Sequence, residues 1–174
     1  PQYSTIASRD DCDVTPYLPK MDLKIPIFAA NMDTVCEEKM ARKMHDLGGC
    51  GIIHRYMKDS ETHNLIYKWF SEDNTAPLTV SVGCFEKDKH RIDAVLSFQE
   101  YPLNICVDLA HGDSSHMLET LAYIRSQAPR WEGALIAGNV CTYEGAVRLF
   151  ELGADIVKVG VGPGSACTTR IKTG

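Results

Sequence analysis

Apolar residues gather in six short runs along the chain, and each run has the continuous hydrophobic character of a strand that is buried on both faces. The runs contain valine and isoleucine, which favour strands, and they begin at Lys24, Cys50, Leu78, Leu103, Ala134 and Asp155. Several segments between them show helical spacing of their apolar positions instead. Strands that alternate with helices in this way indicate a parallel sheet with right-handed crossover connections.

Three of the intervening segments carry clear helix signals. The first lies within Glu37–Gly49, where three large apolar residues share one face that we expect to pack on the sheet: Met40, Met44 and Leu47. Ser114 and Thr142 begin the other two segments and have the side-chain oxygen of an N-cap. Glu86–Arg91 (EKDKHR) is expected to be the solvent-exposed start of a further helix. Two aromatic residues are expected to fill the space between the second helix and the third strand: Trp69 and Phe70.

Polar or reactive residues follow the carboxyl end of every expected strand. They are Asn31 and Asp33, His54 and Arg55, Cys84, Asp108 and His111, Asn139, and Cys167. A barrel assembles its site from many such loops, whereas an open sheet concentrates its site at one switch point. The phosphate fingerprint Gly-x-Gly-x-x-Gly does not follow the first strand. The pattern therefore favours a (β/α)8 barrel over a doubly wound sheet.

The number of repeating units limits what the chain can form by itself. Six strand–helix units are visible, and a closed barrel of this class needs eight. We therefore expect residues 1–174 to belong to a single catalytic barrel domain, as roughly its N-terminal three-quarters, with the C-terminal part absent.

Composition narrows the class of protein. A length of 174 residues with 44% hydrophobic content is enough for one domain with a buried core. The formal net charge of −5 argues against nucleic acid or an anionic membrane as the main partner, and no apolar run is long enough to cross a bilayer. The seven cysteines form no Cys-x-x-Cys pair, which gives little support to a zinc ribbon. We expect a cytoplasmic protein whose cysteines mostly fill the core, with Cys167 as the exception.

The segment KVGVGPGSACTTRIKTG, at residues 158–174, has the most unusual composition in the chain. Its glycines at positions 160, 162 and 164 allow positive φ angles and a close approach of the backbone to a ligand. Carbonyls turned inward can cage a cation, and amides together with Ser165 can hold a phosphate. The thiol of Cys167 is well placed to attack an electrophilic carbon, while Thr169, or a residue outside this sequence, could move protons.

Five motifs in chain order carry a resemblance to a known family: AANMDTV, GIIHR, DLAHGDS, AGNV and KVGVGPGSACTTR. Together they resemble the family of IMP dehydrogenase and GMP reductase, over nearly the whole chain. The family fold is a (β/α)8 barrel, usually assembled as a homotetramer. Its cysteine attacks C2 of a purine nucleotide to give a covalent thioimidate-type intermediate, and a nicotinamide cofactor exchanges hydride at that carbon.

The resemblance implies a role for each matching residue. Cys167 would be the nucleophile, and Thr169 would transfer a proton to the departing amine. Ser165 would hold the nucleotide phosphate, and Asn139 would lie near the base. A potassium ion would be caged by the main-chain carbonyls of Gly162, Gly164, Cys167 and Arg170. The cofactor would contact Ser8, Arg9, Arg55, Asp108, Leu109, Ala110, Val161 and Gly162.

Within the family, the resemblance leans toward GMP reductase. IMP dehydrogenases usually carry a pair of CBS domains between the second helix and the third strand, whereas residues 64–77 pass directly from helix to strand. Asn31 and the segment CTTRIKTG are more similar to reductases, although GIIHRYM is more similar to dehydrogenases. The resemblance thus implies NADPH-dependent reductive deamination of GMP to IMP.

Two alternatives stay open. A dehydrogenase without CBS domains would oxidise IMP to XMP with NAD. A protein of another class, an inactive half-barrel, would bind nucleotide or serve as an assembly module.

Overall fold

The computed structural model describes residue 3 and residues 5–173. One sheet contains six strands, and their order in the sheet is their order along the chain. The strands are β1 (Phe28–Ala29), β2 (Cys50–Ile53), β3 (Leu78–Val82), β4 (Leu103–Asp108), β5 (Leu135–Val140) and β6 (Ile156–Val159). All neighbouring strands pair in parallel.

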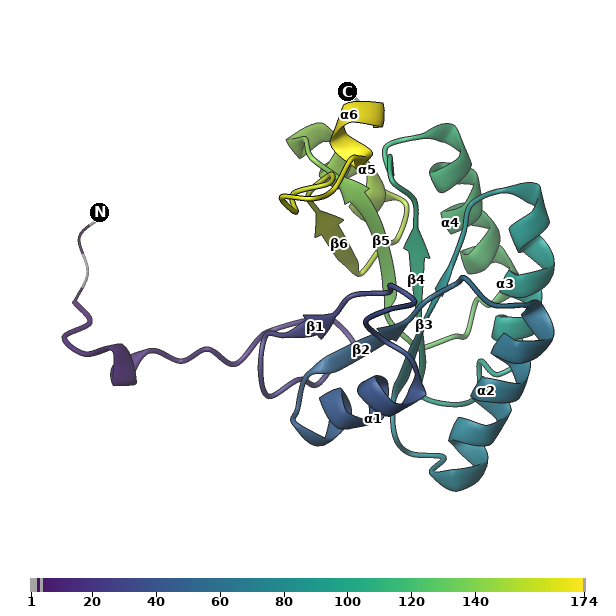
Figure 1. Cartoon of the computed structure of the whole chain (residues 1–174), viewed down its shortest axis with the longest axis horizontal. Coiled ribbons are helices and arrows are strands. Elements are labelled where there is room, and N and C mark those ends of the chain that lie inside the picture. Colours follow the sequence, from purple (N-terminus) through teal and green to yellow (C-terminus); the bar gives the residue numbers. More distant parts are fainter. Residues whose placement is uncertain (1–2, 4, 174) are drawn as a thin grey trace.

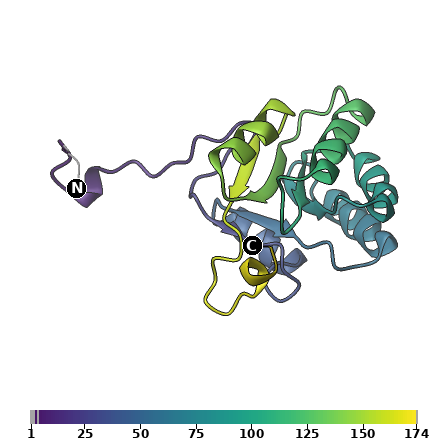
Figure 2. The ribbon, with the colours of Figure 1, turned by 90° about the horizontal axis from the view of Figure 1, so that it is seen from above.

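A helix follows each strand. The α-helices are α1 (Glu38–Asp46), α2 (Asp59–Glu72), α3 (Lys89–Leu96), α4 (Ser115–Gln127), α5 (Tyr143–Glu151) and α6 (Thr169–Thr173), and the short 3-10 helices are η1 (Arg9–Asp11) and η2 (Glu86–Asp88). The sheet curls, and α2, α3 and α4 lie side by side on its outer face (Figures 1 and 2). Because the strand order never reverses, the sheet has no switch point. The chain therefore forms a curled half-barrel, which confirms the predicted (β/α)8 class and excludes the doubly wound alternative.

Side chains of the strands alternate between the two faces of the sheet. One set packs outward against the helices and includes Ile53, Val80, Ile105, Val107 and Leu135. The other set forms a small cluster inside the barrel and includes Cys50, Ile52, Cys106, Ile136 and Ile156. This alternation places Asp108 in phase with Cys106, and Lys158 in phase with Ile156. Both charged residues therefore belong to the inner face.

Local signals in the sequence set the helix ends. The Ser114 hydroxyl accepts from the backbone N–H of Met117 at 3.4 Å, and the Thr142 hydroxyl accepts from Gly145 at 3.1 Å, so both predicted N-caps are confirmed. Trp69 and Phe70 are buried between the helices and the sheet, as predicted.

The predicted buried face of the first helix is wrong for Met40 and Leu47, whereas Met44 is half-buried. Met40 and Leu47 are 43% and 56% exposed, and the buried residue of α1 is Ala41. The helix approaches β2 so closely that a Cβ built on Gly51 would lie 2.5 Å from the Cα of Ala41. Only small residues fit between the helix and the strand at this distance, so the larger apolar side chains lie elsewhere on the helix.

The N-terminal segment leaves the body of the molecule. In Figures 1 and 2 it extends away from the sheet and carries η1 at a distance from every other element. Within the described residues, no helix has the length and apolar character needed to cross a membrane.

Candidate active site

The thiol loop, residues 160–168, leaves β6 at the carboxyl end of the sheet and leads into α6 (Figure 1). Gly160 and Gly162 have φ angles of +121° and +55°, which favour glycine. A Cβ at Gly162 would lie 2.8 Å from the backbone nitrogen of Arg170. The loop therefore folds back tightly on the start of α6, and a side chain at position 162 would push the two apart.

This fold brings two of the predicted catalytic residues together. The Sγ atom of Cys167 lies 3.3 Å from Oγ1 of Thr169, and the thiol is partly exposed. The Thr169 hydroxyl lowers the pKa of the Cys167 thiol, and the Thr169 backbone N–H and the charge of Arg170 lower it further. A lower pKa increases the share of thiolate at neutral pH, and the thiolate is the reactive nucleophile. The other cysteines with a shifted pKa differ, since burial raises the pKa of Cys36, Cys50, Cys84 and Cys106.

A half-buried polar cluster lies at the carboxyl ends of the strands, on the inner face of the sheet. Nζ of Lys158 lies 2.8 Å from Oδ1 of Asp108 and 2.9 Å from Oδ1 of Asn31. Sequence analysis placed Asp108 in the site but missed Lys158, a single charge within an apolar strand. The alternation of faces along β6, where Lys158 shares the side of Ile156, is the signal that can reveal it.

Hydrogen bonds tie the end of β5 to the thiol loop and to the end of β4. Nδ2 of Asn139 donates to the carbonyl of Gly160 at 2.8 Å. The backbone N–H of Asn139 donates to the carbonyl of Leu109, and the N–H of Leu109 donates to the carbonyl of Gly138, both at 2.8 Å. The structure thus joins three predicted site segments: the loop after β4, Asn139, and the first residues of the thiol loop.

Arg55 follows β2 and has an incomplete set of partners. Its Nε atom is buried without a hydrogen-bond partner among the described residues, and its guanidinium carbon lies 5.2 Å from the ring centroid of Tyr56. A buried polar atom that lacks a partner is uncommon and often marks a ligand site. The Nε–H of Arg55 is therefore available to donate a hydrogen bond to a bound ligand.

The loop that carries Arg55 is fixed by Arg91 of α3. Nε of Arg91 donates to Asp59 at 2.9 Å, Nη1 donates to the carbonyl of Arg55 at 2.7 Å, and Nη2 donates to the carbonyl of Met57. The expectation that EKDKHR is solvent-exposed is wrong for Arg91 and Asp88, which are each 7% exposed. The Asp88 carboxylate turns inward to accept the backbone N–H of Phe85 at 3.2 Å.

Several predicted site residues remain at the surface. Ala110, Gly164, Ser165 and Arg170 are exposed. Ser8 and Arg9 lie on the N-terminal segment, away from the thiol loop in both views, where the Ser8 hydroxyl accepts from the N–H of Asp10 at 3.2 Å. The structure of this chain does not bring these two residues to Cys167, and their cofactor role stays a prediction.

The donor set of the thiol loop suits a cation held by the main chain. No group of three or more metal-binding His, Cys, Asp or Glu side chains occurs among the residues described. The carbonyl of Gly164 accepts the N–H of Cys167 at 3.0 Å and keeps a second lone pair. Main-chain carbonyls are the ligands that replace the water shell of potassium in proteins. The thiol loop therefore offers main-chain carbonyls, the type of ligand that the predicted potassium ion would need.

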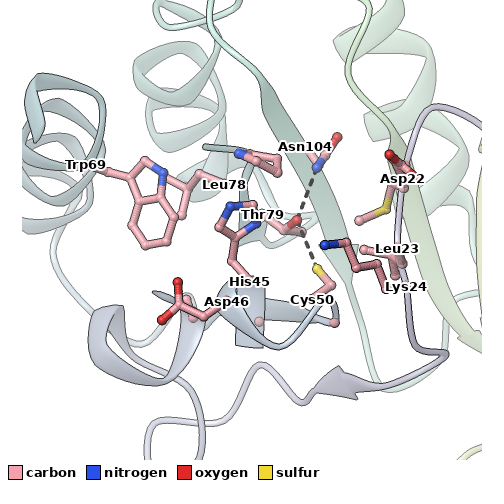
Figure 3. A pocket seen from close by; sticks show the side chains of 16 residues that line it. Asp22, Leu23, Lys24, His45, Asp46, Cys50, Trp69, Leu78, Thr79 and Asn104 are labelled. Carbon is pink, nitrogen blue, oxygen red and sulfur yellow. Dashed lines mark hydrogen bonds between the residues drawn. The ribbon is translucent and has the colours of Figure 1, made fainter. Parts of the chain in front are cut away.

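A separate cavity of about 330 Å³ lies at the opposite, amino-terminal end of the strands (Figure 3). Thr79 forms its polar centre: Nδ2 of Asn104 and Sγ of Cys50 each lie 3.3 Å from the Thr79 hydroxyl. None of the predicted site residues lines this cavity. Its position at the amino ends of the strands separates it from the thiol loop.

Comparison with known proteins is consistent with this geometry. Residues 1–174 match the family described as IMP dehydrogenase / GMP reductase domain. The chain is 37% identical over 179 residues to a GMP reductase of Buchnera aphidicola subsp. Schizaphis graminum, and 34% identical over 174 residues to that of Pediococcus pentosaceus. These matches cover 100% of the chain but 50% and 52% of the respective relatives. The chain thus spans about half the length of the curated relatives it matches.

Proposed function

Because this chain belongs to the IMP dehydrogenase / GMP reductase family, we propose that the protein carrying it is a GMP reductase, an oxidoreductase that converts GMP to IMP with NADPH and releases ammonia. The observation that carries the proposal is the pairing of Cys167 with Thr169 on the glycine loop, where the sulfur lies 3.3 Å from the hydroxyl and the thiol pKa is lowered. The names of the similar proteins, GMP reductase, support the reductase branch.

In the proposed reaction, the Cys167 thiolate adds to C2 of the guanine base. The bond between C2 and the exocyclic nitrogen then breaks, and the amine leaves as ammonia after it has gained a proton. The Thr169 hydroxyl, beside the sulfur, would pass that proton. The product of this half-reaction is a covalent thioimidate on Cys167.

NADPH, when bound, supplies the hydride that reduces C2. The carbon–sulfur bond then breaks, the electron pair returns to sulfur, and IMP leaves, so Cys167 is restored as a thiolate. The thiol loop would hold the nucleotide phosphate through Ser165, and Asn139 would lie near the base. A thiolate that both attacks and departs needs a pKa near the working pH, and the lowered pKa of Cys167 supports this double use.

The cofactor and the cation would be held by the remaining predicted residues. Arg55, with its unpartnered buried Nε, fits a charged part of the cofactor. Asp108, Leu109, Ala110, Val161 and Gly162 would line the nicotinamide, and Ser8 and Arg9 complete the predicted contacts. A potassium ion would be held by the carbonyls of Gly162, Gly164, Cys167 and Arg170. We also propose that residues 1–174 belong to one catalytic barrel domain without CBS domains, in a homotetramer as is usual in the family.

The test uses the full-length protein, incubated with GMP and NADPH and separately with IMP and NAD. A GMP reductase oxidises one NADPH for each ammonia released. NADH formation from IMP, without NADPH oxidation by GMP, would replace the proposal by the dehydrogenase alternative, and inactivity in both assays would favour the non-catalytic half-barrel. Cys167→Ala should abolish turnover while GMP still binds, whereas Cys141→Ala, at an exposed thiol outside the loop, should keep normal turnover. Near-normal turnover of Cys167→Ala would contradict the mechanism.

A further inference from the structure

The side chain of Lys158 joins the two outer strands of the sheet across the inside of the half-barrel. Lys158 lies on β6 and Asn31 follows β1, and these are the two outer strands of the sheet. Their side chains meet at 2.9 Å although 127 residues separate them in the sequence. The same ammonium reaches Oδ1 of Asp108 at the end of β4. One cation thus links three strand ends at the edge where the site is built.

Burial of this charge has a cost that the cluster must offset. Burial opposes the charge of Lys158 most strongly, yet electrostatic interaction with Cys106 and then with Asp108, together with the hydrogen bond to Asp108, raises the pKa of the ammonium above its ordinary value. The Lys158 and Asp108 side chains are 25% and 19% exposed. Apolar residues of similar volume often stabilise a protein as well as a buried ion pair does. The presence of a pair here therefore calls for a reason other than stability.

The hydrogen-bonding capacity of the pair supplies that reason. Asp108 uses Oδ1 for Lys158, and Oδ2 has no hydrogen-bond partner among the described residues. An ionised carboxylate has acceptor capacity on both oxygens, so Oδ2 is free for a ligand. A carboxylate held on one oxygen by a fixed cation cannot rotate freely, and its second oxygen then points in one direction. Asn31, which is only 6% exposed, fixes the cation itself.

We propose that Lys158 is a positioning residue that acts through Asp108: anchored by Asn31, its ammonium orients the Asp108 carboxylate so that Oδ2 receives the nicotinamide cofactor. This inference rests on the proposed function, in which Asp108 contacts the cofactor. Lys158 itself forms no bond to the reacting atoms. Its effect should appear in cofactor recognition and leave the chemistry at Cys167 intact.

The first test compares Lys158→Met with Lys158→Arg in the full-length protein. Loss of a hydrogen bond to a charged group should raise KM for NADPH by about 10-fold to 100-fold. KM for GMP and the rate of Cys167 alkylation by iodoacetamide should stay within about twofold of wild type. Lys158→Arg keeps a charge with several donors, so it should recover part of the loss. The matched control is Lys43→Met, at an exposed lysine of α1, which should behave as wild type.

A double-mutant cycle with Asp108→Asn decides whether Lys158 acts through Asp108. If it does, adding Lys158→Met to Asp108→Asn should change KM for NADPH by no more than about twofold. Independent, multiplying effects would overturn the proposal, as would an unchanged KM in Lys158→Met alone. Should Lys158→Met alone fail to fold, the comparison between Asp108→Asn and the double variant still decides the question, because the double variant leaves no charge of this pair without its partner. A failure of the proposed function is distinct, because wild type would then not oxidise NADPH with GMP.

Discussion

Replacing Arg91 by methionine should destabilise the protein much more than replacing a surface cation on the same helix. Arg91 is 8% exposed in its side chain and donates to three acceptors: Asp59, the carbonyl of Arg55 and the carbonyl of Met57. The Asp59 side chain is 46% exposed, so water can replace its lost partner at little cost. The two carbonyls lose a donor that lies in the protein interior. At about 1–3 kcal/mol for each acceptor left without a partner, and with some relaxation of the loop, Arg91→Met should cost about 2–4 kcal/mol.

Urea unfolding of the full-length protein measures this cost. The control is Lys89→Met, where an exposed lysine pairs with Glu86 on the surface, and this change should have no measurable effect. Arg91→Lys should lie between the two, because one ammonium cannot reach all three acceptors in the geometry of a guanidinium. If Arg91→Met is as stable as Lys89→Met, the three bonds do not hold the loop, and the argument is refuted. Because this loop carries Arg55, the KM for NADPH should also rise in Arg91→Met.

Two further predictions concern the thiol loop. Thr169→Val removes the hydroxyl that lowers the Cys167 pKa, so the pKa should rise. The pH profile of alkylation by iodoacetamide should then move to higher pH, with a slower rate at neutral pH. Thr168→Val is the control, and an unshifted profile in Thr169→Val would contradict the assigned cause. Gly162→Ala places a side chain at a φ of +55° and 2.8 Å from the Arg170 nitrogen, so kcat should fall by about tenfold or more with little change in the unfolding midpoint. Unchanged turnover in Gly162→Ala would show that the loop adapts without cost to the site.

The features that the sequence predicted correctly are those with a local cause. Ser114 and Thr142 cap their helices because the capping oxygen and the free N–H groups lie within three residues of each other. The carboxyl ends of parallel strands share one edge of the sheet, where Asn31 and Asp108 both contact Lys158, although Cys84, which follows β3, is buried beside Met117 of α4. Cys167 and Thr169 are two residues apart, so their contact depends on a single turn of the chain.

The features that the sequence missed have distant causes. The charge run of EKDKHR is typical of a solvated helix start, yet Arg91 is buried because the loop after β2, more than 30 residues earlier, presents carbonyls that need donors. The apolar stripe of α1 was assigned to the core, but the close approach at Gly51 decides which side of the helix faces the sheet. Lys158 and its partner Asn31 are brought together only when six strands curl into a half-barrel. Each error came from reading a local pattern without the segment that lies against it.

The same long-range contacts determine how precisely the residues of the proposed site are held relative to one another. Within the described residues, β1 and β6 have no strand partner on their outer sides, so no backbone ladder fixes the thiol loop relative to the segment after β1. Among the described residues, two polar contacts join the segments on either side of β1 to β6 and the residue before it. Lys20 binds Asp155 at 3.1 Å before β6 begins, but the Lys20 side chain is 37% exposed, and surface pairs contribute little. Near the end of β6, Lys158 binds Asn31, which is buried, so an unpaired amide there would be costly. The position of the end of β6 relative to Asn31 should therefore depend chiefly on Lys158, whereas the geometry around Cys167 depends on contacts within the thiol loop, such as the one with Thr169.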